Sequence, residues 1–220
     1  MRTEDLIREL ASDAPPVRRL QPLAVRLIGW IALALLSLAA VTMWMGARQD
    51  LGEVLQHASF QFETAMLILT AMSAAVGALT VSIPGRERSA VIRWLPIAGG
   101  AICILWVAGE LVFASVTGAP TGRLTFAWRC IYKTASVALV PGIALFVLVR
   151  RAAPLHAAWA GLLAILATAA VGVLGANVIC PIDRPLHLIL WHVGPLMLFA
   201  AAGAGLGTLL IRWHRKLRVS

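Results

Sequence analysis

Six long apolar runs dominate the sequence and limit what it can fold into. They cover about residues 27–46, 62–83, 94–114, 131–149, 157–176 and 187–211. An α-helix of roughly 20 apolar residues crosses a bilayer core about 30 Å thick, so each run is long enough to span a membrane. Hydrophobic residues make up 60% of the chain and charged residues only 13%, which excludes an ordinary soluble domain. The sequence therefore predicts an integral membrane protein.

The apolar runs favour helices over strands. They are rich in Ala, Leu, Gly and Val and lack the alternating pattern of a membrane barrel. Helices also satisfy their own backbone groups within lipid. We therefore expect an all-α protein with six transmembrane helices, the first of which is too long for the core of a signal peptide and is retained. The expected parts are a cytosolic segment (1–22), a transmembrane domain (23–212) and a basic tail (213–220).

The basic residues predict the orientation. If the N-terminus is cytoplasmic, only five of the 19 Lys and Arg residues lie outside, namely Arg48, Arg123, Arg129, Lys133 and Arg184. Such a bias follows the positive-inside rule and places both termini in the cytoplasm. The net charge of +9 is thereby explained by topology, and no direct binding to nucleic acid is expected.

The segment before the first span has the pattern of a short amphipathic helix. Leu6, Ile7 and Leu10 recur on one helical face, and Pro15 and Pro16 end the pattern. A helix of about three turns is marginal alone in water, so its apolar face needs a surface. Both lipid headgroups and a groove on a soluble partner are open at this stage.

Two thiols stand where apolar runs meet the outer side. Cys180 belongs to residues 177–192, the stretch with the most reactive side chains, and Cys130 begins another run at a similar membrane depth. The pair has three possible states: free dithiol, disulfide and metal thiolate. The neighbouring Arg129 and Lys133 favour the reactive thiolate form of Cys130. The third thiol, Cys103, lies mid-span and is expected to pack as a small hydrophobe.

Histidine and aspartate side chains extend this chemistry. Cys130 and Cys180 with His187, or with Asp183, would offer a set of ligands for a soft metal ion. His187 and His192 are about 140° apart on a regular helix, so both can enter one small site only if the helix is broken. We expect His192 to form an interhelical hydrogen bond instead.

One carboxylate, Glu110, is expected inside the third span. Charged groups there are expensive and are usually paired, so Lys133 or Arg129 is the expected partner, with proton or metal chemistry as the alternative. Cys-x-x-Cys pairs, hydrolase triads and phosphate-binding loops are absent from the sequence. We therefore expect no catalytic residues, no enzyme activity and no resident cofactor, although a transient metal ion is possible.

Several of these features together resemble a known family. They are the opening Glu4-Asp5-Leu6-Ile7-Arg8-Glu9-Leu10, the following Asp13-Ala14-Pro15-Pro16-Val17-Arg18-Arg19-Leu20, the six spans, Cys130, and the segment from Cys180-Pro181 to Trp191-His192. In these the chain resembles, over essentially its whole length, the NrsF-like family of bacterial membrane anti-sigma factors.

The resemblance implies a multi-pass protein of the bacterial inner membrane that holds an extracytoplasmic-function sigma factor inactive. It further implies that two periplasmic cysteines, matched by Cys130 and Cys180, are needed to respond to heavy metals or oxidants. The partners would be the sigma factor and the lipid bilayer. The expected sigma-binding residues are Leu6, Ile7, Leu10, Arg18 and Arg19. The alternative is a small transporter or metal-efflux component that uses Glu110, Cys180 and His187.

Overall fold

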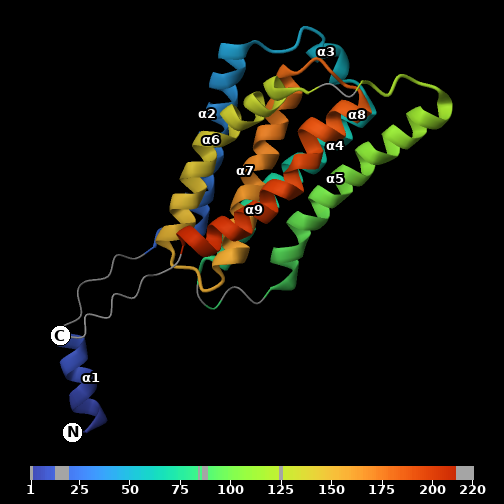
Figure 1. The fold of residues 1–220 in the computed structure, drawn as a ribbon. Helices are drawn as coiled ribbons and strands as arrows, with labels where there is room; N and C mark the ends of the chain where they lie inside the picture. Colours follow the sequence, from blue (N-terminus) through green and yellow to red (C-terminus); the bar gives the residue numbers. More distant parts are fainter. Residues whose placement is uncertain (1, 13–19, 84, 86–88, 124–125, 212–220) are drawn as a thin grey trace.

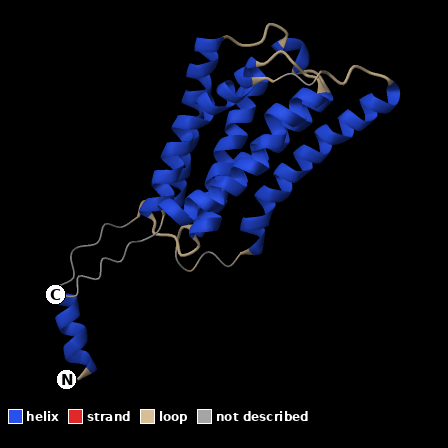
Figure 2. Ribbon diagram, viewed as in Figure 1, coloured by secondary structure: helices blue, strands red, loops and turns tan. Residues whose placement is uncertain are grey.

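The structure is a computed structural model that describes residues 2–12, 20–83, 85, 89–123 and 126–211. Within these ranges it contains helices and loops but no strand (Figure 2). Six helical segments are long and apolar enough to cross a membrane. They are α2 (Leu23–Met45), α4 (Ala58–Val81), α5 (Ala90–Thr117), α6 (Trp128–Arg151), α7 (Ala157–Ile179) and the composite span Pro185–Leu210. The predicted all-α, six-span fold class is thus confirmed, and the cytoplasmic location of the termini stays a prediction.

Two shorter helices lie outside the spans. The predicted amphipathic helix is present as α1 (Thr3–Ser12), which stands apart from the bundle in Figure 1. A second helix, α3 (Leu51–Val54), follows the first span. The Asp50 side chain precedes this helix without capping it, because its carboxylate accepts hydrogen bonds from Arg48.

Helix α7 is the centre of the bundle (Figure 1). In its most apolar window 78% of the residues are buried, compared with 22–56% in the other spans. Glycine makes this close packing possible, because a Cβ atom on Gly161 would overlap the backbone of Gly203 and Gly207 in the last span. Gly203 and Gly207, small residues four positions apart in the last span, therefore allow that span to pack closely against α7.

A proline in α6 creates polar contacts with α2. Pro141 has no N–H, so the Val137 carbonyl one turn earlier has no helical donor. The Ser37 hydroxyl of α2 donates to that carbonyl at 2.9 Å. Nearby, Trp30 Nε1 donates to the Pro141 carbonyl at 3.0 Å, and Arg26 Nη2 donates to the Leu148 carbonyl at 2.7 Å. Three side chains of α2 thus bind the backbone of α6.

The last span is not one regular helix. It consists of α8 (Pro185–Leu188), a π-helical segment (Ile189–Val193) and α9 (Gly194–Leu210). Pro195 cannot donate to the carbonyl one turn earlier, and the Gly194 N–H instead reaches the Ile189 carbonyl, five residues back. A Cβ atom at position 194 would collide with the Ile189 oxygen. The Gly194-Pro195 pair therefore accounts for the wider turn.

Candidate functional site

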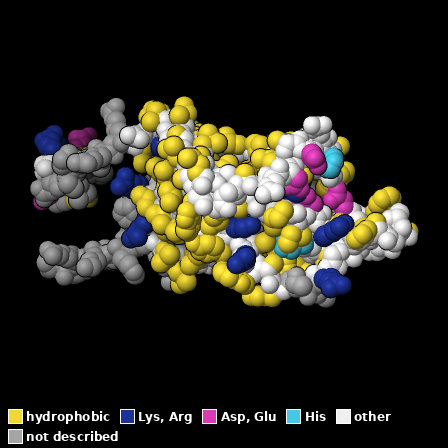
Figure 3. Space-filling view, turned by 90° about the horizontal axis from the view of Figure 1, so that it is seen from above, with side chains coloured by type: hydrophobic (Ala, Val, Ile, Leu, Met, Phe, Trp, Pro, Cys, Tyr) yellow, Lys and Arg dark blue, Asp and Glu magenta, His cyan; other side chains and the backbone are white. Residues whose placement is uncertain are grey.

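The candidate site lies at the end of the bundle that carries α3, opposite the end where α2 begins and α9 ends (Figure 1). We call this the α3 end; it includes the described connecting residues 46–57, 118–123, 126–127 and 180–184. Side chains of Asp and Glu gather on this face among apolar side chains (Figure 3). Three elements meet beneath it: the first turn of α6, the C-terminal end of α7 and the broken start of the last span.

A cluster of two thiols and two imidazoles occupies this meeting point. Cys130 opens α6, Cys180 follows α7, His187 lies on α8 and His192 lies in the π-helical segment. Each of the four residues is at most 5% exposed. One ligand atom from each lies within 4.8 Å of all the others. We call these four residues the thiol-imidazole cluster.

The distances within the cluster are short but non-covalent. The two Sγ atoms are 3.5 Å apart, and His187 Nε2 is 3.3 Å from Cys130 Sγ and 3.7 Å from Cys180 Sγ. Because a disulfide bond measures about 2.05 Å, both cysteines are free thiols here. The unlinked sulfurs and their histidine neighbours suit both a free dithiol and a metal thiolate.

The electrostatics favour a thiolate at Cys180. The hydrogen bond from Cys130 holds the pKa of the Cys180 thiol well below its usual range, and the contact with His187 adds to this against the effect of burial. We had expected the thiolate at Cys130, next to Arg129 and Lys133. The contacts with Cys130 and His187 favour Cys180 as the thiolate of the pair.

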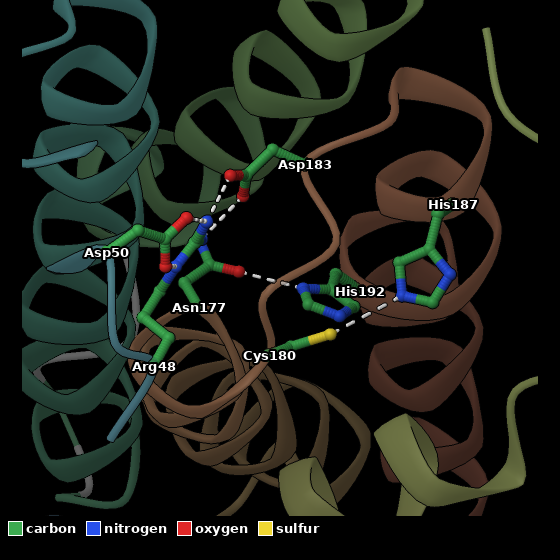
Figure 4. Close-up of polar contacts among 7 residues, drawn as sticks. All are labelled: Arg48, Asp50, Asn177, Cys180, Asp183, His187 and His192. Carbon is green, nitrogen blue, oxygen red and sulfur yellow. Dashed lines mark hydrogen bonds and ion pairs between the residues drawn. The ribbon is translucent and has the colours of Figure 1, made fainter. Parts of the chain in front are cut away.

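His192 enters the cluster because the helix is broken there. In a π-helical turn, residues five apart are about one turn apart, so their side chains share a face. The rings of His187 and His192 accordingly lie with centroids 5.2 Å apart. The predicted interhelical hydrogen bond of His192 is also confirmed, because its Nδ1 lies 2.8 Å from Asn177 Oδ1 on α7 (Figure 4).

That hydrogen bond is part of a chain of polar contacts that we did not predict. Asn177 Nδ2 donates to Glu63 Oε1 of α4 at 2.9 Å, and both residues are 5% exposed. Glu63 lies within one of the apolar runs, and Asn177 directly follows another. A carboxylate within a span usually indicates a functional or paired group. We applied this rule to Glu110 only, and applying it to Glu63 as well would have identified Glu63 as such a group.

A buried arginine organises the loop after Cys180. Arg48 binds Asp50 through Nε and Nη2 at 2.7 and 2.8 Å, and binds both carboxylate oxygens of Asp183, including one through Nη1 at 2.6 Å (Figure 4). Hydrogen bonds to Asp50 and Asp183 raise the pKa of Arg48. The hydrogen bond between Arg48 and Asp50 also lowers the pKa of the Asp50 carboxyl group. Asp183 therefore binds Arg48 and is not among the four clustered ligand residues, so His187 rather than Asp183 lies beside the two thiols.

The remaining predicted neighbours lie in different places. Lys133 Nζ donates to the Ile179 carbonyl at 3.2 Å, next to Cys180, whereas Arg129 is exposed. Glu110 lies beside Ser59 and Trp106, and the ion pairs among the described residues are those of Arg48. The predicted ion pair of Glu110 with Lys133 or Arg129 is wrong, because α5 packs on α4 whereas α6 packs on α2 and α7.

The predicted sigma-binding residues are only partly described. In α1, Leu6 is 42% exposed and Ile7 is 61% exposed, so this face of the helix is uncovered. Arg18, Arg19 and the tail 213–220 lie outside the described residues, as does the side chain of Leu10. The role of all five residues stays a prediction.

An apolar groove of about 580 Å³ runs between α6 and the last span, over α7. It begins at His192 beneath the thiol-imidazole cluster. Its walls are formed by Leu139 and Ile143 of α6 and by Phe199 and Leu206 of α9. The side of α6 that faces α9 is therefore not packed against protein along much of its length.

Comparison with known protein families gives a match over most of the chain. The family described as NrsF, negative regulator of sigma F, matches residues 10–213. The match covers nearly the whole chain, including all four residues of the thiol-imidazole cluster, and it begins after Leu6 and Ile7. No curated protein and no solved structure matches the chain.

Proposed function

Because the chain belongs to the NrsF family of negative regulators of sigma F, we propose that it is a membrane-bound anti-sigma factor for a sigma factor of the extracytoplasmic-function class. It acts in the inner membrane of a bacterium, with both termini in the cytoplasm. The thiol-imidazole cluster then lies at the periplasmic side, where it detects heavy metals or oxidants. Detection lowers the affinity for the sigma factor and releases it.

The observation that carries this proposal is the proximity of Cys130 and Cys180. Their sulfur atoms are 3.5 Å apart although 50 residues separate them in sequence. They join the start of α6 to the end of α7, so any reaction at the pair changes a contact between two spans. An oxidant that removes two electrons and two protons links them as a disulfide, which requires the sulfurs to approach by about 1.5 Å. A thiophilic metal ion instead binds both thiolates.

The exposed apolar face of α1 supports the sigma-binding role. Leu6 and Ile7 present side chains that a short helix alone does not bury. The acidic residues Glu4, Asp5 and Glu9 disfavour an anionic lipid surface. A groove on a cytosolic protein suits an apolar face with acidic flanks better.

The contacts between α2 and α6 suggest how the two ends communicate. Cys130 lies at the start of α6, and Ser37, Trp30 and Arg26 bind the α6 backbone at successive levels toward its other end. The segment 1–22 leads directly into α2. A tilt of α6, which the apolar groove leaves room for, is thus passed to α2 and to the sigma-binding segment.

The test is a pull-down from cytosol with the full-length protein in detergent. Truncation of residues 2–20, or Leu6→Asp with Leu10→Asp, should abolish capture of a sigma factor. Ser12→Asp, which adds a carboxylate to the other face of α1, is the matched control and should retain it. A folded preparation that captures no sigma factor would refute the proposal and lead to metal-flux assays for the transporter alternative.

A further inference from the structure

We propose that Cys130, Cys180, His187 and His192 form a complete four-ligand centre for a thiophilic divalent cation such as Zn²⁺ or Cd²⁺, in which Asn177 and Glu63 are positioning residues. This inference deepens the proposed sensing role and commits it to metal coordination. It adds a fourth ligand, and it assigns a purpose to two buried polar residues within the membrane spans.

The distances approach those of a tetrahedral site. With metal–sulfur and metal–nitrogen bonds of about 2.3 and 2.05 Å, a tetrahedron has ligand separations of roughly 3.8 Å for two sulfurs and 3.6 Å for sulfur and nitrogen. The observed separation of the sulfurs is 3.5 Å, and His187 Nε2 lies 3.3 and 3.7 Å from them. No ligand atom is more than 4.8 Å from another, so movements of about 1 Å complete the site.

The free nitrogen of His192 is the most specific sign of a ligand. His192 is 1% exposed, and among the described residues its Nε2 has no hydrogen-bond partner. A buried polar atom without a partner costs free energy unless another group binds it. Figure 4 shows this nitrogen turned toward the Cys180 sulfur. A cation between the thiols and imidazoles would supply the missing partner.

The hydrogen bonds behind His192 set its protonation for this role. Asn177 donates through Nδ2 to Glu63, so the amide oxygen of Asn177 faces His192 Nδ1 and accepts from it. Neutral His192 therefore carries its proton on Nδ1 and presents a lone pair on Nε2. Metal-binding histidines commonly donate their second ring N–H to an oxygen in this way. Glu63 acts through Asn177, whose amide orientation it fixes.

The total charge of the four ligands balances that of a divalent ion. When the ion binds, the two cysteines ligate as thiolates and any thiol proton passes to solvent, so the centre is neutral overall. Neutrality matters in a buried site, where net charge is costly. Asp183, the remaining nearby carboxylate of this loop, binds Arg48. Two sulfurs and two imidazoles suit Zn²⁺ or Cd²⁺ and disfavour Mg²⁺ or Ca²⁺.

The experiment is a titration of the reduced, full-length protein in detergent with Co²⁺ as the spectroscopic probe, followed by displacement with Zn²⁺ and Cd²⁺. We expect one Co²⁺ per chain with the intense d–d bands of a tetrahedral site and a thiolate-to-metal charge-transfer band. Zn²⁺ should abolish both. Absence of these bands in wild type would overturn the proposal.

Variants identify the fourth ligand and the positioning residues. His192→Ala should weaken Co²⁺ binding at least tenfold and alter the d–d bands. Asn177→Leu should weaken it about 10- to 100-fold, the range typical for loss of such a supporting hydrogen bond, while keeping the charge-transfer band of the two thiolates. Cys103→Ser, at the buried thiol outside the cluster, should bind as wild type does. Unchanged affinity and spectrum in His192→Ala would refute the fourth ligand.

Glu63→Gln separates an effect on folding from an effect on positioning. The glutamine keeps the size of the side chain and an acceptor oxygen, so the variant should fold as wild type does and weaken Co²⁺ binding less than Asn177→Leu. Equal weakening by both variants would contradict a role for Asn177 as the direct support. The titration involves no sigma factor, so its failure would leave the anti-sigma proposal standing, and failure of the pull-down would leave the metal centre standing.

Discussion

The Ser37 hydroxyl of α2 donates a hydrogen bond of 2.9 Å to the Val137 carbonyl of α6, the carbonyl that Pro141 leaves without a helical donor. Both partners are buried, so neither is exchanged for water. The bond couples the span that begins with Cys130 to the span that follows the N-terminal segment. A proline that would weaken an isolated helix thereby produces a specific contact between two helices.

Replacing Ser37 should therefore destabilise the bundle through Val137. In Ser37→Ala the carbonyl loses its donor, and we expect a loss of about 1 kcal/mol, within the range measured for interhelical hydrogen bonds in membranes. Adding Pro141→Ala restores a backbone N–H to α6, so the double variant should recover much of that loss. Reversible unfolding in mixed micelles measures Ser37→Ala, Pro141→Ala and the double variant.

The control for this cycle is Ser115→Ala. The Ser115 hydroxyl is exposed and binds Leu111 of its own helix, so its removal should change stability little. If Pro141→Ala failed to reduce the effect of Ser37→Ala, the hydroxyl would have another role than replacing the proline's missing donor.

The cysteine pair predicts a separation between repression and induction. Cys130→Ser and Cys180→Ser keep the size of each side chain but remove the thiolate, so repression of a sigma-dependent reporter should persist while induction by Cd²⁺ or an oxidant is lost. Cys103→Ser should behave as wild type does. Loss of membrane-inserted protein in the serine variants would instead indicate a structural role for the pair.

Much of the fold could be predicted because span length and apolarity are local properties of the sequence. The ends of the six spans were predicted to within a few residues. The prediction that Cys130 and Cys180 lie at the same end of the bundle was also correct. The pairings of Arg48 with Asp183 and of Glu63 with Asn177 join residues more than 100 positions apart. Such contacts depend on which helices are neighbours, which the sequence pattern does not specify. The error at Glu110 has the same cause.

Arg48 should protect the loop that carries Cys180. Its guanidinium holds Asp50 and Asp183 together, and its backbone N–H donates to the Val178 carbonyl at 3.0 Å. Lysine keeps the charge but cannot bind two carboxylates through a planar fork. Arg48→Lys should therefore lower the Tm of the protein in detergent and speed alkylation of the otherwise buried Cys180 by a maleimide, measured in a Cys103→Ser, Cys130→Ser background.

The matched control is Arg123→Lys, at an exposed arginine of the same end, which should alter neither quantity. Asp183→Asn should increase the alkylation rate as Arg48→Lys does, because it breaks the same contact. An alkylation rate that rises in one variant only would show that the ion pair is not what shields the thiol.

The π-helical turn should be necessary for His187 and His192 to share one site. Gly194 allows that turn, because its missing Cβ leaves room for the Ile189 carbonyl. Gly194→Ala introduces that atom and should force the segment toward a regular helix, in which the two imidazoles diverge by about 140°. Co²⁺ affinity should then fall as it does in His192→Ala, with the two thiolate bonds retained.

Gly205→Ala is the matched control on the same span, since nothing lies within 4 Å of its added Cβ, and it should bind Co²⁺ normally. Wild-type affinity in Gly194→Ala would show that the imidazoles converge without the wider turn.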